Sequence, residues 1–311
     1  MHAGWRQYFK QRLKKSSKFY SVGIEIGMDT IQVSVLLKDK ESVRWVKQQL
    51  LPAHDWQKHL HNYVSSESLS NTPCHIVFAA CKYQIQQVDK PQVTDDELGQ
   101  ALVWTVKDLL PHQEEIVVDY FELPAQSAGT NNVNVVAILK SEIEAITDGV
   151  IEAGLDLKSI GILELVVTDM LEQSDDAVLT LVQEPGQDIC LNIVKNGNVY
   201  FTRRLRGYEN LSTFSEQELQ MGVGDNLSVE IQRSMDYFES QLRQAPVKKI
   251  LLSIESQHLQ KLSELMQQLT FVNVEPWYPE IQSTDNLTYR SGLLGSLGAA
   301  YLEQNGLHHE E

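Results

Sequence analysis

The stretch "GIEIGMDTIQVSVLL", Gly23 to Leu37, decides the fold that we expect for this chain. It predicts two short apolar strands, around Val22–Ile26 and Gln32–Leu37, joined by a tight turn at Gly27–Thr30. Turns of this kind often bind phosphate, because successive backbone N–H groups form an anion-binding nest. Glu25 adds an acidic residue in the strand before the turn, as such hairpins often do. The hairpin is therefore the first candidate for a functional site.

Length and composition describe a soluble globular protein. The chain has 311 residues, enough for about two domains of ordinary size. Hydrophobic residues make up 42% and charged residues 22%, which is not the balance of a disordered chain. Three cysteines, an odd number, favour reduced thiols in a reducing compartment. No apolar run approaches the ~20 residues that span a bilayer, and there is no signal-peptide pattern, so we expect a cytoplasmic protein.

The formal net charge of −16 makes nucleic acid an unlikely partner, because an acidic surface repels phosphate. Residues 1–18 differ from the rest, since they carry only basic charges. Trp5, Phe9 and Leu13 would share one side of a helix there. One interpretation is a weak contact of residues 1–18 with anionic membrane lipid. The other is a solvated basic tail.

Strands and helices alternate along the whole chain, which favours an α/β fold with mixed sheets. Beyond the hairpin, strands are expected at Ser42–Leu50, His75–Phe78, Val117–Leu123, Asn132–Leu139, Ile160–Ile162, Val178–Gln183, Ile189–Val194, Val199–Arg204, Ile250–Ser253 and Val272–Val274. Helices are expected at Trp56–Val64, Ser141–Ala153, Glu164–Glu172, Leu227–Gln244 and Tyr289–Glu303. One more helix, which follows the strand Ile250–Ser253, is expected to end at about Leu269. A hinge is expected at Ser174–Asp176, and Asn196-Gly197 predicts a hairpin turn.

A further helix, "TDDELGQALVWTVKDLLP", is expected to begin with a capping box of Thr94 and Glu97 and to end before Pro111. The sequence predicts a buried stripe on this helix, widened by Ala101, at Leu98, Leu102, Thr105 and Leu109. Trp104 falls off that stripe. It is either ordinary core filling or an anchor for a partner peptide, since tryptophan is enriched at interface hot spots.

Motifs for catalysis or metal binding are missing from the sequence. There is no P-loop, GxGxxG, HExxH, GxSxG or CxxC motif. His59 and His61 are two apart on a predicted helix and would face different ways, so they predict no metal site. We therefore expect no catalytic residue and no metal ligand.

Several longer stretches resemble one family. "IQQVDKPQVTDDELGQALVWTVKDLLPHQEEIVVDYFELP", Ile85 to Pro124, is similar to the type IV pilus assembly protein PilM. "VNVVAILKSEIEAITDGVIEAGLDLKSIGILEL" and "LSVEIQRSMDYFESQ" are also PilM-like, and "VVDYFELP" resembles MshI of mannose-sensitive haemagglutinin (MSHA) pilus biogenesis. The hairpin itself, Gly23 to Gly27, resembles the first phosphate motif of the actin superfamily, which includes FtsA and PilM.

The resemblance implies an actin-like (ribonuclease H-like) fold of two lobes, with nucleotide bound between the lobes in relatives. The first half would span residues 21–173 and include a PilM/FtsA-type inserted subdomain, called 1C, at about 74–140. The second half would span 174–304 and include a helical small subdomain at about 214–270. A basic tail, 1–20, and a polar tail, 305–311, would flank them.

The resemblance also implies that the phosphate hairpin, Gly23, Glu25, Gly27, Asp29 and Thr30, is vestigial. Glu25 stands where the family usually has an Asp that holds Mg²⁺ through water, and Mg²⁺ tolerates displaced ligands poorly. Asp29 brings a negative charge to the phosphate position. Family members commonly have small hydroxyl residues and a lysine around this turn, and the chain has Met28 and Gln32 there instead.

The other two nucleotide motifs of the family also carry residues that disfavour nucleotide binding. The second phosphate motif is replaced by Gln183-Glu184-Pro185, which loses the Asp, adds an anion and removes one N–H donor. The adenosine motif is replaced by Ile254-Glu255-Ser256, which has no glycine to let the backbone approach a base or ribose. We therefore expect no ATP cofactor and no enzymatic activity.

The function that this predicts is a cytoplasmic scaffold of type IV, MSHA-type, pilus assembly at the inner face of the inner membrane. Its partner would be the short cytoplasmic tail of a PilN-type membrane protein, which PilM binds in a groove between the first large subdomain and the insert. One alternative is an active ATP-binding or ATP-hydrolysing PilM-like protein. Another is the L-type component of a type II secretion system, which is disfavoured because such proteins carry a membrane span.

Overall fold

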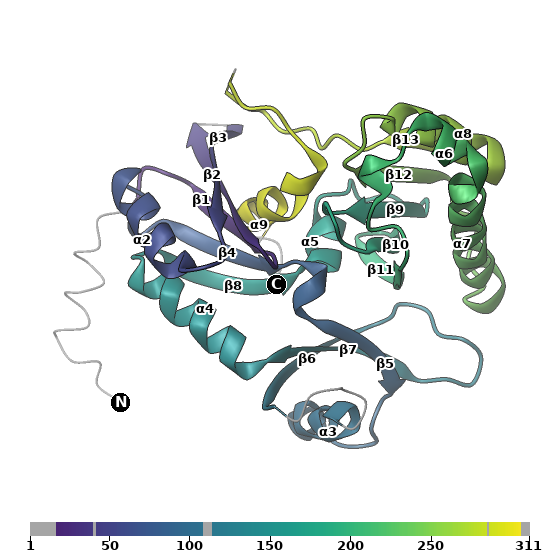
Figure 1. Cartoon of the computed structure of the whole chain (residues 1–311). Helices are drawn as coiled ribbons and strands as arrows, with labels where there is room; N and C mark the ends of the chain where they lie inside the picture. The colour runs from purple at the N-terminus through teal and green to yellow at the C-terminus, as the bar shows by residue number, and fades with distance from the viewer. Residues whose placement is uncertain (1–16, 40–41, 108–113, 285, 306–311) are drawn as a thin grey trace.

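The computed structural model describes residues 17–39, 42–107, 114–284 and 286–305. In this part of the chain two five-stranded sheets and one three-stranded sheet are present, each with its own helices (Figure 1). Short helical turns lie at Ala80–Lys82, Leu211–Thr213, Glu216–Glu218 and Ser291–Leu293. No helix among the described residues has the length and apolar character needed to cross a membrane.

The first five-stranded sheet is built around the hairpin. Its strands, in spatial order, are β3 (Ser42–Pro52), β2 (Thr30–Asp39), β1 (Ser21–Ile26), β4 (Pro73–Phe78) and β8 (Asp156–Ile162). β1 pairs antiparallel with β2 and parallel with β4, and all of its residues are buried, as in a strand covered on both faces. The predicted hairpin is confirmed, and its second strand begins two residues earlier than expected.

Helices cover both faces of this sheet. On one face lie α2 (Trp56–Ser66) and α4 (Lys140–Glu152), whose apolar residues share a core with β1 and β4. On the other face α9 (Leu294–Asn305) packs directly across β1, β2 and β4. Gly23 makes this approach possible, because a Cβ at that position would overlap the main chain of Ser296 and Ala300. The helix expected at Ser141–Ala153 is confirmed as α4, which begins one residue earlier, after Leu139, and has no side-chain cap.

The three-stranded sheet lies between β4 and α4 in the chain, and we call this segment, residues 80–139, the insert. Its strand order is β5 (Gln84–Asp89), β7 (Asn132–Leu139), β6 (Ile116–Glu122), and α3 (Asp95–Lys107) packs on it. β5 was not expected from the sequence. The predicted stripe on α3 is wrong in one position: Leu98, Leu102 and Val106 are buried, whereas Thr105 is exposed and donates to the main-chain oxygen of Ala101. Leu109 and Pro111 lie outside the described residues.

The second five-stranded sheet has the order β11 (Asn198–Leu205), β10 (Ile189–Lys195), β9 (Val178–Gln183), β12 (Lys249–Ile254), β13 (Asn273–Pro276). Asn196 and Gly197 both have positive φ angles, 51° and 69°, so the predicted hairpin turn is confirmed. Over this sheet lie α7 (Gly224–Asp236) and α8 (Leu259–Thr270). The long helix expected at Leu227–Gln244 is confirmed in its main part: α7 runs without a break into a π-helical turn, Tyr237–Gln241, and the helical stretch ends three residues earlier than expected.

The two halves meet through a shared apolar cluster. It contains Val77 of the first sheet, Leu251 of the second, and Leu294 of α9, together with residues of α5 (Leu163–Asp169). α5 and α9 lie between the two five-stranded sheets (Figure 1). This packing fixes the hairpin of the first half opposite the strand ends of the second half.

Candidate functional site

A cavity of about 370 Å³, which we call the inter-lobe pocket, lies where the hairpin faces the second half. The first half contributes the turn, Gly27 to Thr30, and the second half contributes Glu184, Pro185 and Glu255. These are the segments that, by their resemblance to the actin superfamily, correspond to the phosphate and adenosine motifs. The fold therefore brings these three segments together in one pocket.

The inter-lobe pocket is acidic. Four carboxyl side chains line it, those of Glu25, Asp29, Glu184 and Glu255, against one arginine, Arg290. A triphosphate entering it would meet more negative than positive charge, and repulsion between charges at close range is strong where solvent is partly excluded.

Glu25 is the most buried of these carboxyl groups, with 1% of its surface exposed. Neither of its oxygens has a hydrogen-bond partner of good geometry among the described residues, and the side chain lies against Gly295 of α9. Burial raises the pKa of Glu25 well above its usual range, and the neighbouring carboxylate of Glu184 raises it further. A buried carboxyl group with a raised pKa gives up its proton reluctantly and is a poor holder of a hydrated magnesium ion, so these residues do not fit a magnesium–nucleotide complex.

Main-chain and amide groups of the hairpin already have partners within the protein. The N–H of Gly27 donates to the main-chain oxygen of Thr30 at 3.0 Å, so it is not free to bind a phosphate. Gln32 Nε2 donates to the main-chain oxygen of Gly292, across the pocket. Gly23 lies in the middle of β1 under α9 and does not line the pocket.

Metal-binding geometry is also missing in the described part of the chain. No group of three or more histidine, cysteine or acidic residues there is arranged to hold a metal ion.

A second cavity, of about 270 Å³, lies between the first half and the insert, and we call it the Met28 groove. Met28 of the hairpin is 59% exposed at its edge. Ile116, Ile138 and Leu139 of the insert supply apolar walls, and an ion pair of 3.2 Å joins Lys82 to Glu142 beside them. The sequence carries no motif that points to this group of residues. The one signal it contained was a large apolar residue, Met28, in a turn.

Trp104 lies on the outer face of α3 and is 68% exposed. The Nζ of Lys107 lies 5.9 Å from its ring centroid. The interpretation of Trp104 as ordinary core filling is therefore wrong, and its role as a partner contact stays a prediction.

Comparison with models of protein families found no match, and none of the curated proteins matches the chain. Solved structures do match over most of its length. A chain of the "PilM-PilN type IV pilus biogenesis complex" is 15% identical, with a TM-score of 0.66 over 92% of this chain and 99% of that chain.

Two further structures have the same overall arrangement. The cytoplasmic domain of EpsL, an inner membrane component of the type II secretion system of Vibrio cholerae, is 13% identical, with a TM-score of 0.51 over 92% of this chain and 94% of that one. A Bacteroides thetaiotaomicron protein described as having an actin-like ATPase fold is 11% identical, with a TM-score of 0.51 over 86% and 93%. At these identities the likeness concerns the fold, and the chain has the actin-like ATPase fold that its sequence predicted.

Proposed function

We propose that this protein is a scaffold of type IV pilus assembly, of the MSHA type, and not an ATPase. The observation that carries the proposal is the burial of the Glu25 carboxyl group beside Glu184, in the pocket where actin-like proteins hold nucleotide phosphates. The likeness to a chain of the PilM–PilN complex supports the pilus system. The "VVDYFELP" segment supports the MSHA type.

The proposed partner is a PilN-type inner-membrane protein, because the similar solved structure is a complex of PilM with PilN. The Met28 groove fits a short extended segment of such a partner, since it combines apolar walls with the Lys82–Glu142 pair. The protein would then act at the inner face of the inner membrane. A contact of residues 1–18 with anionic lipid is part of this proposal and lies outside the described residues.

Thermal unfolding with and without millimolar ATP and Mg²⁺ tests the absence of a working nucleotide pocket. A ligand at ~100 times its dissociation constant stabilises a protein by ~2.7 kcal/mol, which would raise the melting temperature by several degrees. We expect no shift. A clear shift that needs both ATP and Mg²⁺ would instead support the alternative of an active ATP-binding protein.

Binding of a synthetic PilN-type cytoplasmic tail tests the partner and its site. Met28→Gln should weaken capture of this peptide by roughly fivefold or more, because an exposed apolar contact is lost. Met221→Gln is the matched control, since Met221 is 74% exposed on the second half, away from the groove. Equal binding by both variants would remove the Met28 groove as the site.

The second candidate is the L-type component of a type II secretion system, which the likeness to cytoplasmic EpsL favours. The neighbouring gene separates the two candidates. A gene for a small protein with one membrane span and a short cytoplasmic tail supports the pilus scaffold.

A further inference from the structure

A cavity of about 760 Å³ separates the insert from the second half of the protein, and we call it the β5–β11 cleft. Its size falls within the ~300–1,000 Å³ typical of ligand sites. Four consecutive residues of β5, Gln84 to Gln87, line one side. Four consecutive residues of β11, Phe201 to Arg204, line the other. In Figure 1 the two strands face each other across this space.

Both strands are edges of their sheets. Within the described residues β5 pairs only with β7, and β11 pairs only with β10. Side chains of a strand alternate between two faces, so a cavity lying on one face would be lined by every second residue. Because consecutive residues line the β5–β11 cleft, it runs along the strand edges. Each edge there presents backbone N–H and C=O groups that its own sheet does not use.

Contacts at both ends of the cleft join the insert to the second half. At one end Arg204 Nη1 donates to the main-chain oxygen of Tyr83 at 3.2 Å, and the hydroxyl of Tyr83 donates to Glu164, which is 1% exposed. At the other end Ser127, in the loop between β6 and β7, lies 3.2 Å from the hydroxyl of Tyr237. The cleft is thus a built feature of the domain arrangement.

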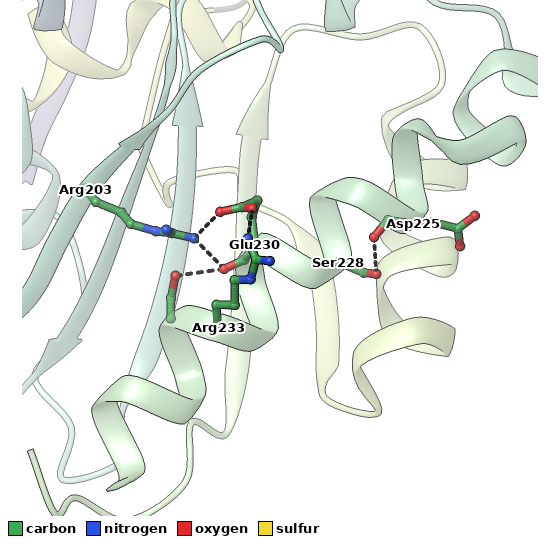
Figure 2. A network of polar contacts seen from close by, with 6 residues as sticks. Arg203, Asp225, Ser228, Glu230 and Arg233 are labelled. Atoms are coloured by element: carbon green, nitrogen blue, oxygen red, sulfur yellow. Dashed lines mark hydrogen bonds and ion pairs between the residues drawn. The ribbon is translucent and has the colours of Figure 1, made fainter. Parts of the chain in front are cut away.

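The charges in the cleft are mainly positive, although the protein as a whole carries −16. Arg203, Arg204 and Arg206 line it, against the single carboxylate of Glu164. Figure 2 shows how Arg203 is held: its Nη2 donates to the carboxylate and to the main-chain oxygen of Glu230, each at 2.7 Å. Its Nε is buried and has no acceptor among the described residues.

Arg204 and Arg206 have capacity left for a ligand. Arg204 Nη2 is buried beside the cleft, lies 3.7 Å from Glu164 and makes no hydrogen bond with any described residue. Arg206 is 89% exposed, and its Nε lies 3.9 Å from Asp188. A guanidinium group only donates hydrogen bonds, so a ligand would meet these groups through acceptor atoms such as carboxylate or carbonyl oxygens.

We propose that the β5–β11 cleft binds an extended acidic segment of a partner protein. The segment adds as a strand to the free edge of β5 or β11, its backbone bonding to the edge and its carboxylates meeting Arg204 and Arg206. Ile85, Leu123 and Phe201 accept apolar side chains between the acidic ones. This site differs from the Met28 groove, which lies against the hairpin, although Cys81, Tyr83 and Gln84 border both.

The probes are biotinylated ten-residue peptides in which valine alternates with glutamate, and a second set in which valine alternates with lysine. A third probe is the glutamate peptide with its backbone nitrogens methylated, which keeps the side chains and removes the backbone donors. Binding is measured on the full chain, and amide hydrogen exchange is followed in β5 and β11. We expect the glutamate peptide alone to bind and to slow exchange in at least one of the two strands.

Arg206→Glu should weaken binding of the glutamate peptide about tenfold at low salt, because a charge at the rim of an interface governs encounter and salt dependence. Lys248→Glu is the matched control, since it makes the same change of charge at an exposed residue outside the cleft. Met28→Gln should leave this binding unchanged.

Four results would overturn the proposal: no binding by any peptide, equal binding by the lysine peptide, equal binding by the methylated peptide, or equal loss in the Lys248→Glu control. Competition by pyrophosphate together with binding of the methylated peptide would show a small-anion site in place of a strand site.

Discussion

Glu25 and Glu184 bring two carboxyl groups together from opposite halves of the molecule, and the first of them is buried without a good hydrogen-bond partner among the described residues. An isolated charge at such a position is costly, so Glu25 stays protonated to well above its ordinary pKa. The site that holds phosphates in other actin-like proteins thus contains a buried carboxyl group beside a second acid.

Replacing Glu25 by Gln should stabilise the protein increasingly as the pH rises. The pKa of Glu25 is raised in the folded state. At pH values between its pKa in the unfolded and in the folded protein, the folded protein therefore binds one proton more than the unfolded protein. Stability is therefore lost as the pH rises through the folded pKa, and the Gln variant avoids this loss. Urea unfolding over a pH series measures the difference. The exposed Glu239→Gln serves as control, and an equal gain in both variants would contradict the argument.

His75 should make the protein less stable in acid. Its ring bonds to Ser159 Oγ and Glu303 Oε2, each at 2.8 Å, and so joins β4, β8 and α9. Burial lowers the pKa of His75, an effect that the carboxylate of Glu303 opposes and the charge of Lys158 reinforces. The stabilising neutral form is present above the unfolded pKa of about 6.5 and is lost as the pH falls through the folded pKa.

Replacing His75 by Gln should flatten the dependence of stability on pH between about pH 5 and 7, the range in which histidine titrates. His61→Gln is the control, because His61 is exposed on α2. An unchanged pH profile in the His75 variant would show that other groups cause the acid sensitivity.

Gly23→Ala should destabilise the protein by about 3 kcal/mol, the cost of forcing a methyl group into close-packed backbone. The added Cβ would lie 2.9 Å from the Cα of Ala300, and backbone cannot move aside as a flexible side chain can. Gly99→Ala is the matched control. It lies in α3 with open space around its Cβ position, so alanine should stabilise that helix by ~1 kcal/mol. Equal effects of the two changes on the melting temperature would refute this account of Gly23.

Trp104→Ala should leave the free energy of unfolding within about 0.5 kcal/mol of the parent, because an exposed side chain contributes little to folding. As a partner contact, the same change should weaken capture of a PilN-type peptide by ~2 kcal/mol. Leu98→Ala, at a buried position on the same helix, should instead cost ~2–5 kcal/mol of stability. If the Trp104 variant both melts and binds like the parent, the partner does not reach α3.

Much of the fold could be predicted because its strands are apolar and β-branched. β7 and β9 have the bounds expected from their sequences. β5 was missed because Gln84, Gln86 and Gln87 carry no strand signal, and pairing with β7 makes it a strand. The error on α3 has a similar cause. The sequence predicted that Thr105 is buried, whereas Val106 is the buried residue; both positions fit a helical stripe, and only contact with the insert's sheet decides between them.

The candidate sites were less accessible to sequence reasoning. The acidic character of the inter-lobe pocket was predicted because family motifs identify its three segments. The contact of Arg204 with Glu164 and Tyr83 was not predicted. It joins three segments that are far apart in the chain, and the spacing of these residues in the sequence gives no signal. Such convergence is a property of the tertiary structure.

The packing of α9 across β1 has a consequence for how the protein is made. Ser21 donates a buried hydrogen bond of 2.6 Å to the main-chain oxygen of Ala300, across a separation of 279 residues. During synthesis, β1 therefore stays uncovered on one face until α9 has emerged from the ribosome, which happens after the strands of both five-stranded sheets have emerged. Until then its exposed apolar face is a hazard for aggregation, and contacts of such long range form slowly. The first half therefore cannot complete its folding before α9, which ends the second half of the chain, has been synthesised.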